Sequence, residues 1–351
     1  MCDKEMIVIM PQDLSPAFGR IADIALSEKK YRLIRNKDEL TDLSGKKILF
    51  IVELNDSGIC IELYKILDKL NEFGNQCMKD SIGSIVIHSK NELYTRSVAR
   101  KIILHANMCG CIFPGRPLTE ATGSYKNLIS YKKLYPDLTN EDILLMLCKE
   151  TVKRLEDFYE PKFENPNILV LHASNYNTSN TLLLWQMIKN NLNSTNINEI
   201  HISNGTIKDC KACSFKACTH FAEQNACFYG GVMVEEVYPA ILACDILILL
   251  CPNYNDSLSA NLTAVINRFT ALFRNNDFSG KYLYSVIVSG HCGSDLIAEQ
   301  LISAININKK FILPPYFSIT ETANDKNSIS EVENISTKAE NFARNIKTRS
   351  I

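Results

Sequence analysis

The sequence predicts an α/β protein, with a doubly wound, parallel, five-stranded sheet in its C-terminal half. The main observation is that short apolar runs alternate with longer segments of helical periodicity. The second is that several of these runs end in polar or glycine-containing loops that lead into the next helical segment. A length of 351 residues, 46% of them hydrophobic and 22% charged, is typical of a globular chain with two domains.

The C-terminal half supplies the clearest strands and helices. Strands are expected at 167–173, 198–203, 245–251, 282–289 and 311–313, and helices at 180–192, 232–243, 257–274, 293–305 and 331–347. The helix at 257–274 carries an apolar stripe at three- and four-residue steps, formed by Leu258, Leu262, Val265, Ile266, Phe269, Leu272 and Phe273. The stripe predicts that this helix packs in the core of its domain. The alternative is that part of the stripe contacts another subunit.

The N-terminal half shows the same alternation of apolar runs and helical segments and is interpreted as a degenerate second copy of the fold. Its strands are expected at 6–10, 47–53 and 83–88, and its helices at 15–28, 58–72, 91–106 and 139–157. In layout, 44–67 resembles 279–301 and 81–102 resembles 243–266, although this strand order departs from a simple duplication. The polar segment 159–167 contains two prolines and is interpreted as a linker. The predicted domains are therefore 1–160, without cofactor, and 161–351.

One N-terminal segment, 107–127, is rich in glycine and proline and is expected to be a long loop. Such a loop is either a surface connection or a functional lid over a cofactor. It contains Cys109 and Cys111 in a C-x-C arrangement, which by itself is weak evidence for a metal. Other cysteines in apolar or helical patterns, among them Cys77, are expected to be buried and inert.

The bulk composition excludes several functional classes. The net charge is −1, so no strong field favours nucleic acid or an anionic membrane. No apolar run approaches the roughly 20 residues that span a bilayer, and the first residues lack the layout of a signal peptide. We therefore expect a cytoplasmic protein with neither nucleic acid nor membrane as partner. Thirteen cysteines in that setting favour metal or redox use over a disulfide framework.

The most informative segment is the loop after the strand at 167–173. It is rich in hydroxyl and amide side chains and leads directly into a helix; its candidate ligand residues are Ser174, Asn175, Asn177, Ser179, Asn180 and Thr181, with Tyr176 between them. The first N–H groups of a helix lack internal partners and attract an anion. Because the loop has no Lys or Arg, it suggests a buried monophosphate such as that of FMN. The alternative is a cluster of N-capping residues with no ligand.

Two further loops follow strands of the same predicted sheet. The first contains Pro252, Asn253, Tyr254 and Asn255, and the second Ser289, Gly290, His291, Cys292 and Gly293. Ligands of open parallel sheets bind beyond the carboxyl ends of the strands, so the three loops are expected to meet there. The tyrosine offers an aromatic face to a flat heterocycle, and the glycines allow close backbone approach. Taken singly, each loop is also compatible with an ordinary strand-to-helix turn.

Together, SNYNTSNT, CPNYNDSLSANLTAVINRF and SGHCGSD resemble the flavodoxin-like NADPH-dependent FMN reductase family over roughly 165–310. In that family the loops are a Ser-rich phosphate loop, an S-P-x-Y segment followed by a helix ending in Asp-Arg, and a Gly-containing loop. Here Asn267-Arg268 stands in place of Asp-Arg, and Cys251, Asn253 and Thr263 replace the commoner Ser, Val and Lys. The resemblance implies a flavodoxin-like fold and an FMN site in the C-terminal half. Residues 1–160 match no family motif, and a flavodoxin-like fold is expected there only from the internal likeness of the two halves.

A cysteine-rich insertion at 209–228 contains Cys210, Cys213, Cys218 and Cys227 in a C-x2-C-x4-C-x8-C arrangement. Iron–sulfur flavoproteins of the same superfamily carry four cysteines at this place, usually with shorter spacings. Four thiolates can hold a [4Fe–4S] cluster or a tetrahedral zinc ion. A cysteine-rich loop without metal is the third interpretation.

The resemblance implies an FMN-dependent oxidoreductase that takes electrons from NAD(P)H, or from a reduced ferredoxin-like carrier, and passes them to a small acceptor such as a quinone. FMN carries the chemistry, so no dedicated catalytic residue is predicted. Family members usually act as dimers or larger assemblies, which implies a homodimer here. The rival hypotheses are a non-enzymatic electron carrier or redox sensor and a scaffold without flavin.

Overall fold

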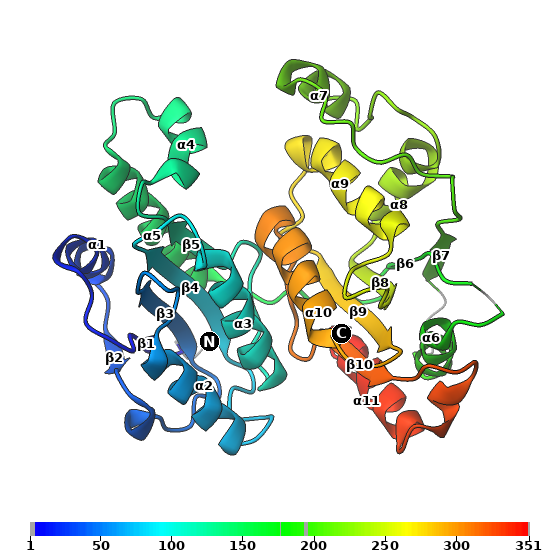
Figure 1. Ribbon diagram of the computed structural model, residues 1–351, viewed down its shortest axis with the longest axis horizontal. Helices are drawn as coiled ribbons and strands as arrows, with labels where there is room; N and C mark the ends of the chain where they lie inside the picture. The colour runs from blue at the N-terminus through cyan, green and yellow to red at the C-terminus, as the bar shows by residue number, and fades with distance from the viewer. Residues whose placement is uncertain (1–3, 176, 193–195, 350–351) are drawn as a thin grey trace. The chain divides into compact units, whose positions relative to one another are not determined.

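The structure is a computed structural model that describes residues 4–175, 177–192 and 196–349, and its chain divides into two compact units, residues 1–159 and 160–351. Each unit is built on a five-stranded parallel sheet (Figure 1). Both sheets are doubly wound, with helices packed against both faces.

The N-terminal unit has the strand order β2-β1-β3-β4-β5. Its strands are β1 (Met6–Ile9), β2 (Tyr31–Ile34), β3 (Lys47–Leu54), β4 (Ile82–Ser89) and β5 (Leu118–Ala121). Its helices are α1 (Pro16–Leu26), α2 (Ile61–Glu72), α3 (Thr95–Met108), α4 (Ile129–Leu134) and α5 (Asn140–Asp157), with 3-10 turns at Lys37–Glu39 and Lys126–Leu128. The central strands β3 and β4 are almost entirely buried, which explains their continuous apolar sequences.

The C-terminal unit has the order β10-β9-β8-β6-β7. Its strands are β6 (Ile168–His172), β7 (Ile197–His201), β8 (Ile246–Pro252), β9 (Tyr282–Ser289) and β10 (Ser318–Thr322). Its helices are α6 (Asn180–Asn190), α7 (Phe215–Ala222), α8 (Tyr238–Ala243), α9 (Ala260–Asn275), α10 (Ser294–Leu301) and α11 (Ile335–Lys347). A π-helical turn, Met233–Val237, precedes α8, another, Ile302–Ile307, continues α10, and a 3-10 turn covers Ser328–Glu331.

The two units repeat one another in detail. When the strands of each unit are numbered in chain order and read from the edge strand β2 or β7, both sheets have the order 2-1-3-4-5. This is the flavodoxin-like arrangement. Ile85 pairs with Leu118 and Ser285 with Ser318, and the isolated bridges Ile82–Ile112 and Tyr282–Ile312 recur at the same place. Helix α1 packs on α5 as α6 packs on α11. The expectation of a second copy of the fold is confirmed.

The predicted correspondence between segments of the two halves was wrong. The segment 44–67 contains β3, whose equivalent in the other unit is β8, and the segment 81–102 contains β4, whose equivalent is β9. The sequence comparison had exchanged the two, because both central strands are apolar runs that end in a polar loop. When β3 is matched with β8 and β4 with β9, the strand order of the two units is the same.

Three further expectations need correction. Residues 311–313 make only one isolated bridge, and the edge strand is β10, at Ser318–Thr322. In the N-terminal unit, Ile112 makes the bridge that corresponds to the one at Ile312. The segment 107–127 around it is not one long loop, since it contains the end of α3, this bridge and the strand β5. The short strand β2 and the helices α4 and α7 escaped prediction, because each shows few buried apolar positions.

The apolar stripe of α9 lies in the core of its own domain. Leu262, Val265, Phe269 and Leu272 are each at most 1% exposed. The stripe is therefore accounted for without a subunit contact. Within the described ranges, none of the helices combines the length and the apolar character needed to cross a bilayer.

Candidate functional site

The loop after β6 leads into the N-terminus of α6, as the sequence predicts. Helix α6 begins at Asn180, and the Ser179 hydroxyl caps it by accepting the Leu182 backbone N–H at 3.1 Å. The Asn177 N–H donates to Asn175 Oδ1 at 2.9 Å, which folds the loop into an Asx turn. Asn175 and Asn177 are exposed, and Tyr176 lies outside the described residues.

Ser174 is the residue of this loop with an unfilled hydrogen-bonding capacity. Its side chain is 1% exposed, and its hydroxyl has no hydrogen-bond partner among the described residues. A buried hydroxyl without a partner costs about 1–3 kcal/mol, and a bound water, ion or ligand is one explanation for it. Its place beside the N-terminus of α6 suits a phosphate.

Two predicted ligands of the loop serve the fold. The Asn180 side-chain amide donates to the carbonyl oxygens of Ala323 and Asp325, at 3.1 and 2.8 Å, and its Oδ1 accepts the Ile329 N–H at 3.4 Å. Thr181 is 2% exposed. Asn180 thus fixes the start of α6 against the segment after β10.

Asn253 joins the loops that follow β8 and β9. Its Nδ2 donates to Ser289 Oγ at 3.1 Å and to the Cys292 carbonyl at 2.9 Å. Its Oδ1 is buried and has no partner within the described part of the chain. Ser289 Oγ in turn lies 2.7 Å from Ser294 Oγ at the start of α10. The two predicted loops are therefore one hydrogen-bonded unit at the carboxyl edge of the sheet.

The glycines of the β9 loop allow this close approach. A Cβ on Gly293, whose φ is +84°, would lie 2.2 Å from Asp256 Oδ1, and one on Gly290 would lie 2.8 Å from Asn324 Oδ1. At Gly293 the positive φ favours glycine, whereas Gly290 meets only the end of the Asn324 side chain. His291 and Cys292 are exposed, and the His291 carbonyl accepts the Thr322 hydroxyl at 3.1 Å.

The remaining predicted residues form an exposed turn. Tyr254 is 54% exposed and pairs with Ser257, and Asn255 has a φ of +52°. Pro252, the last residue of β8, is half-buried. The turn presents an aromatic ring at the rim of the site.

A pair of histidines at the ends of β6 and β7 was not predicted from the sequence. The rings of His172, at the end of β6, and His201, at the end of β7, stack with centroids 4.9 Å apart. Burial, with a smaller contribution from His201, lowers the pKa of His172 to about 4. The imidazole next to the predicted phosphate loop is therefore neutral at pH 7. Adjacent strand ends with one histidine each were the sequence signal for this pair.

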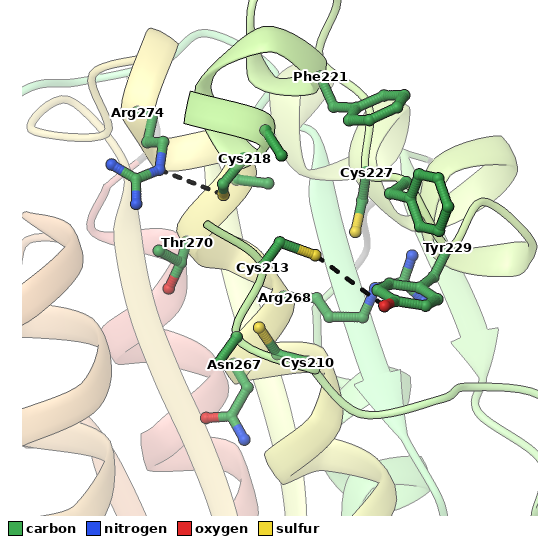
Figure 2. A pocket seen from close by; sticks show the side chains of 14 residues that line it. Cys210, Cys213, Cys218, Phe221, Cys227, Tyr229, Asn267, Arg268, Thr270 and Arg274 are labelled. Atoms are coloured by element: carbon green, nitrogen blue, oxygen red, sulfur yellow. Dashed lines mark hydrogen bonds between the residues drawn. The ribbon is translucent and has the colours of Figure 1, made fainter. Parts of the chain in front are cut away.

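The four cysteines of the insertion line a single cavity of about 140 Å³ between α7, α9 and the segment 227–229, as Figure 2 shows. Cys210 is exposed, while Cys213, Cys218 and Cys227 are half-buried. Arg274 Nε donates to Cys218 Sγ at 3.3 Å, and Cys213 Sγ lies 4.0 Å from the Tyr229 hydroxyl. The sequence therefore identified a real gathering of thiols.

The metal prediction for these cysteines is not supported. Across the residues that the structure describes, no three His, Cys, Asp or Glu side chains are grouped so that they could hold a metal ion. A zinc ion, with Zn–S bonds of about 2.3 Å, needs sulfurs within roughly 4 Å of one another. The four thiols instead line the wall of a cavity.

The buried Arg268 braces the wall of this cavity. It is 3% exposed, and its Nη2 donates to the Gly230 carbonyl at 2.9 Å. Its backbone carbonyl accepts the Tyr238 hydroxyl at 2.6 Å. The neighbouring Asn267 donates to Asp209 Oδ1 at 2.9 Å, which ties the insertion to α9. Asn267 and Arg268, which stand where the family usually has Asp-Arg, thus both form hydrogen bonds that hold the fold together.

The N-terminal unit has a different arrangement at the equivalent edge. Glu53, near the end of β3, is 3% exposed and accepts hydrogen bonds from the Ser15 N–H at 2.5 Å and the Ser15 hydroxyl at 2.8 Å. His88 Nδ1 lies 2.8 Å from Glu53 Oε1, the oxygen that also accepts the Ser15 hydroxyl. Ser15 precedes α1 as Ser179 precedes α6, so a carboxylate of the protein occupies the helix N-terminus. Sequence reasoning did not find this pair.

The comparisons with known proteins agree with the resemblance of the three loops. Residues 166–324 match the family model for NADPH-dependent FMN reductase. No curated protein sequence matches the chain.

Several solved structures are similar to part of the chain. A Trp repressor binding protein from Bacillus subtilis is 17% identical, with a TM-score of 0.35, over 49% of this chain and 96% of that one. An NAD(P)H:quinone oxidoreductase from Methanothermobacter marburgensis is 14% identical, with a TM-score of 0.37, over 52% and 98%. An azoreductase from Bacillus anthracis is 12% identical, with a TM-score of 0.35, over 51% and 97%.

Proposed function

Because the C-terminal half belongs, over residues 166–324, to the flavodoxin-like NADPH-dependent FMN reductase family, we propose that the chain is an FMN-dependent oxidoreductase. In this proposal it takes electrons from NAD(P)H or a reduced ferredoxin-like carrier and passes them to a small acceptor such as a quinone. The observation that carries it is the unpartnered, buried Ser174 hydroxyl beside the N-terminus of α6.

The phosphate of FMN would bind in the loop before α6. The helix N-terminus supplies unpaired backbone N–H groups and a favourable dipole, and Ser174 supplies a buried donor. Neutral donors of this kind bind a phosphate through oriented hydrogen bonds rather than a fixed countercharge. The neutral His172 beneath the loop adds no charge to this site.

The flavin ring would lie against the joined loops after β8 and β9. Gly290 and Gly293 keep the backbone accessible there, and Asn253 holds the two loops together. Tyr254 is exposed at the rim and could stack on a flat ring. When bound, FMN supplies the electron-transfer chemistry, and these side chains bind and orient it.

The visible spectrum of the purified protein, followed by titration with FMN, tests the cofactor. We expect flavin absorbance that co-purifies or appears on addition of FMN with saturable binding. A protein that neither carries nor binds FMN would support the flavin-free scaffold. Iron and zinc analysis of the same sample tests the thiol cavity separately.

Steady-state oxidation of NADH and NADPH, with FMN and a soluble quinone, tests the reaction. Turnover with either nicotinamide supports the reductase. FMN binding without quinone reduction from NADH, from NADPH or from a reduced ferredoxin-like donor would favour the rival electron carrier. Size-exclusion chromatography with light scattering tests the proposed homodimer.

A further inference from the structure

Two cysteines of the N-terminal domain are held side by side at the amino-terminal edge of its sheet. Cys77 lies in the turn between α2 and β4, and Cys109 is the C-cap of α3. The Met78 N–H donates to the Cys109 carbonyl at 2.9 Å, and the Cys77 carbonyl accepts the Leu43 N–H at 3.2 Å. The backbones that carry the two thiols are therefore fixed against one another.

The backbone bond from Met78 to Cys109 brings the two cysteines next to one another, and the Cys77 thiol also lies 3.4 Å from the Leu70 carbonyl oxygen. The Cys109 side chain lowers the pKa of the Cys77 thiol, and the Cys77 side chain, together with burial, raises that of Cys109. Cys77 is half-buried, whereas Cys109 is 2% exposed. Cys77 is thus the more accessible of the two thiols, and Cys109 is the buried one.

The third cysteine of this region has a different environment. Cys111 is fully buried, and its thiol bonds to Ser81 and to the Ile112 carbonyl at 3.5 Å. Burial raises its pKa to about 12. The C-x-C arrangement therefore contains one paired thiol and one inert thiol.

We propose that Cys77 and Cys109 form a redox-active dithiol that closes reversibly into a disulfide on reaction with hydrogen peroxide or a small organic disulfide. The site lies in the domain that carries no phosphate loop, and it does not depend on the proposed flavin chemistry.

With peroxide, the Cys77 thiolate attacks one oxygen, the O–O bond breaks, and the other oxygen leaves as hydroxide, which takes up a proton to form water. This step oxidises Cys77 to a sulfenic acid. Cys109 then attacks the Cys77 sulfur, the S–O bond breaks, a second water leaves, and the S–S bond forms. A small disulfide gives the same product by two exchanges that release two thiols. A dithiol reductant reverses both routes.

The test is peptide mapping of the reduced, full-length protein after graded peroxide and alkylation of the remaining thiols. We expect a Cys77–Cys109 crosslinked peptide, lighter than the two free peptides by two hydrogen atoms and lost on treatment with dithiothreitol. In Cys109→Ser, Cys77 should instead accumulate as a sulfenic acid that dimedone traps. In Cys77→Ser, neither product should form.

Cys111→Ser is the matched control, since it removes a neighbouring thiol that lies outside the pair and should keep the crosslink. Circular dichroism melts of the variants establish that each is folded before oxidation. The proposal is overturned if Cys77 links to Cys111, or if Cys77 and Cys109 both stay alkylatable at a peroxide dose that oxidises the exposed Cys210 and Cys292.

Discussion

Ser15 donates both its backbone N–H and its hydroxyl to the carboxylate of Glu53, at 2.5 and 2.8 Å. The equivalent Ser179 of the second domain accepts a hydrogen bond from its own helix instead, and the nearby Ser174 hydroxyl has no partner among the described residues. One copy of the fold therefore fills the N-terminus of its first helix with an internal anion. The other leaves donors there for an external one.

Glu53→Gln should destabilise the N-terminal domain by about 3 kcal/mol, because an amide cannot accept from Ser15 and His88 as a buried carboxylate does. Burial raises the pKa of Glu53, but the hydrogen bonds from Ser15 and His88 outweigh it and hold the pKa below its usual value. Urea denaturation at pH 7 measures the change. Glu5→Gln, which removes an exposed partner of Lys46, is the control and should leave the stability nearly unchanged. Equal losses in both variants would contradict a special role for Glu53.

Ser174→Ala should weaken FMN binding by at least about tenfold, since it removes a donor to a charged phosphate. The stability of the apoprotein should not fall, because the hydroxyl has no partner to lose. Fluorescence titration with FMN and a thermal melt measure both quantities. Ser285→Ala is the matched control: its hydroxyl is also buried without a partner in the described chain, but it lies within β9. Unchanged affinity in Ser174→Ala would place the phosphate elsewhere.

Gly293→Ala should lower both stability and FMN affinity. Its φ of +84° costs an L-residue about 1–2 kcal/mol, and the new methyl group would lie 2.2 Å from Asp256 Oδ1 and 3.1 Å from Asn253 Nδ2. Gly205→Ala separates the two effects, because Gly205 has a φ of +80° but no atom within 4 Å of an added Cβ. The control should lose stability and keep FMN affinity. If both variants bind FMN normally, the joined loops do not contact the flavin.

The stability of the C-terminal domain should fall as the pH drops from about 6.5 to about 4. The unfolded chain protonates His172 near pH 6.5, whereas the native chain, in which burial lowers the pKa to about 4, does not. Protonation therefore favours unfolding over this window, by about 3 kcal/mol at its lower end, and has no effect above pH 7. Urea midpoints at several pH values measure this. His172→Phe should flatten the profile, while substitution of the exposed His291 should leave it unchanged.

Much of the fold could be predicted because its signals are local. The apolar run of β8 and the helical period of α9 each lie within one segment, and both elements form where expected. The edge strand β10 was missed because Ser318–Thr322 alternates weakly and has a single buried residue, Ile319. Its place depends on pairing with β9, from Ser285 to Ser289, which no local pattern contains.

The candidate site divides in the same way. The candidate phosphate loop was identifiable because hydroxyl-rich residues directly precede a helix. That Asn180 is bound to Ala323 and Asp325, across more than a hundred residues, could not be read from its neighbours. The sequence suggested four cysteines as metal ligands by their spacing, but spacing along the chain does not set the distances between sulfurs around the cavity.

The sequence by itself determined that this is a doubled α/β protein with one hydroxyl-rich loop before a helix, since period and loop chemistry are properties of single segments. The tertiary structure decided what each candidate group meets. It set Glu53 against Ser15, Cys77 against Cys109, and left Ser174 without a partner in the described chain. The physical reason is that strand register and helix packing bring together groups far apart in sequence, and hydrogen bonds depend on those separations to within fractions of an ångström.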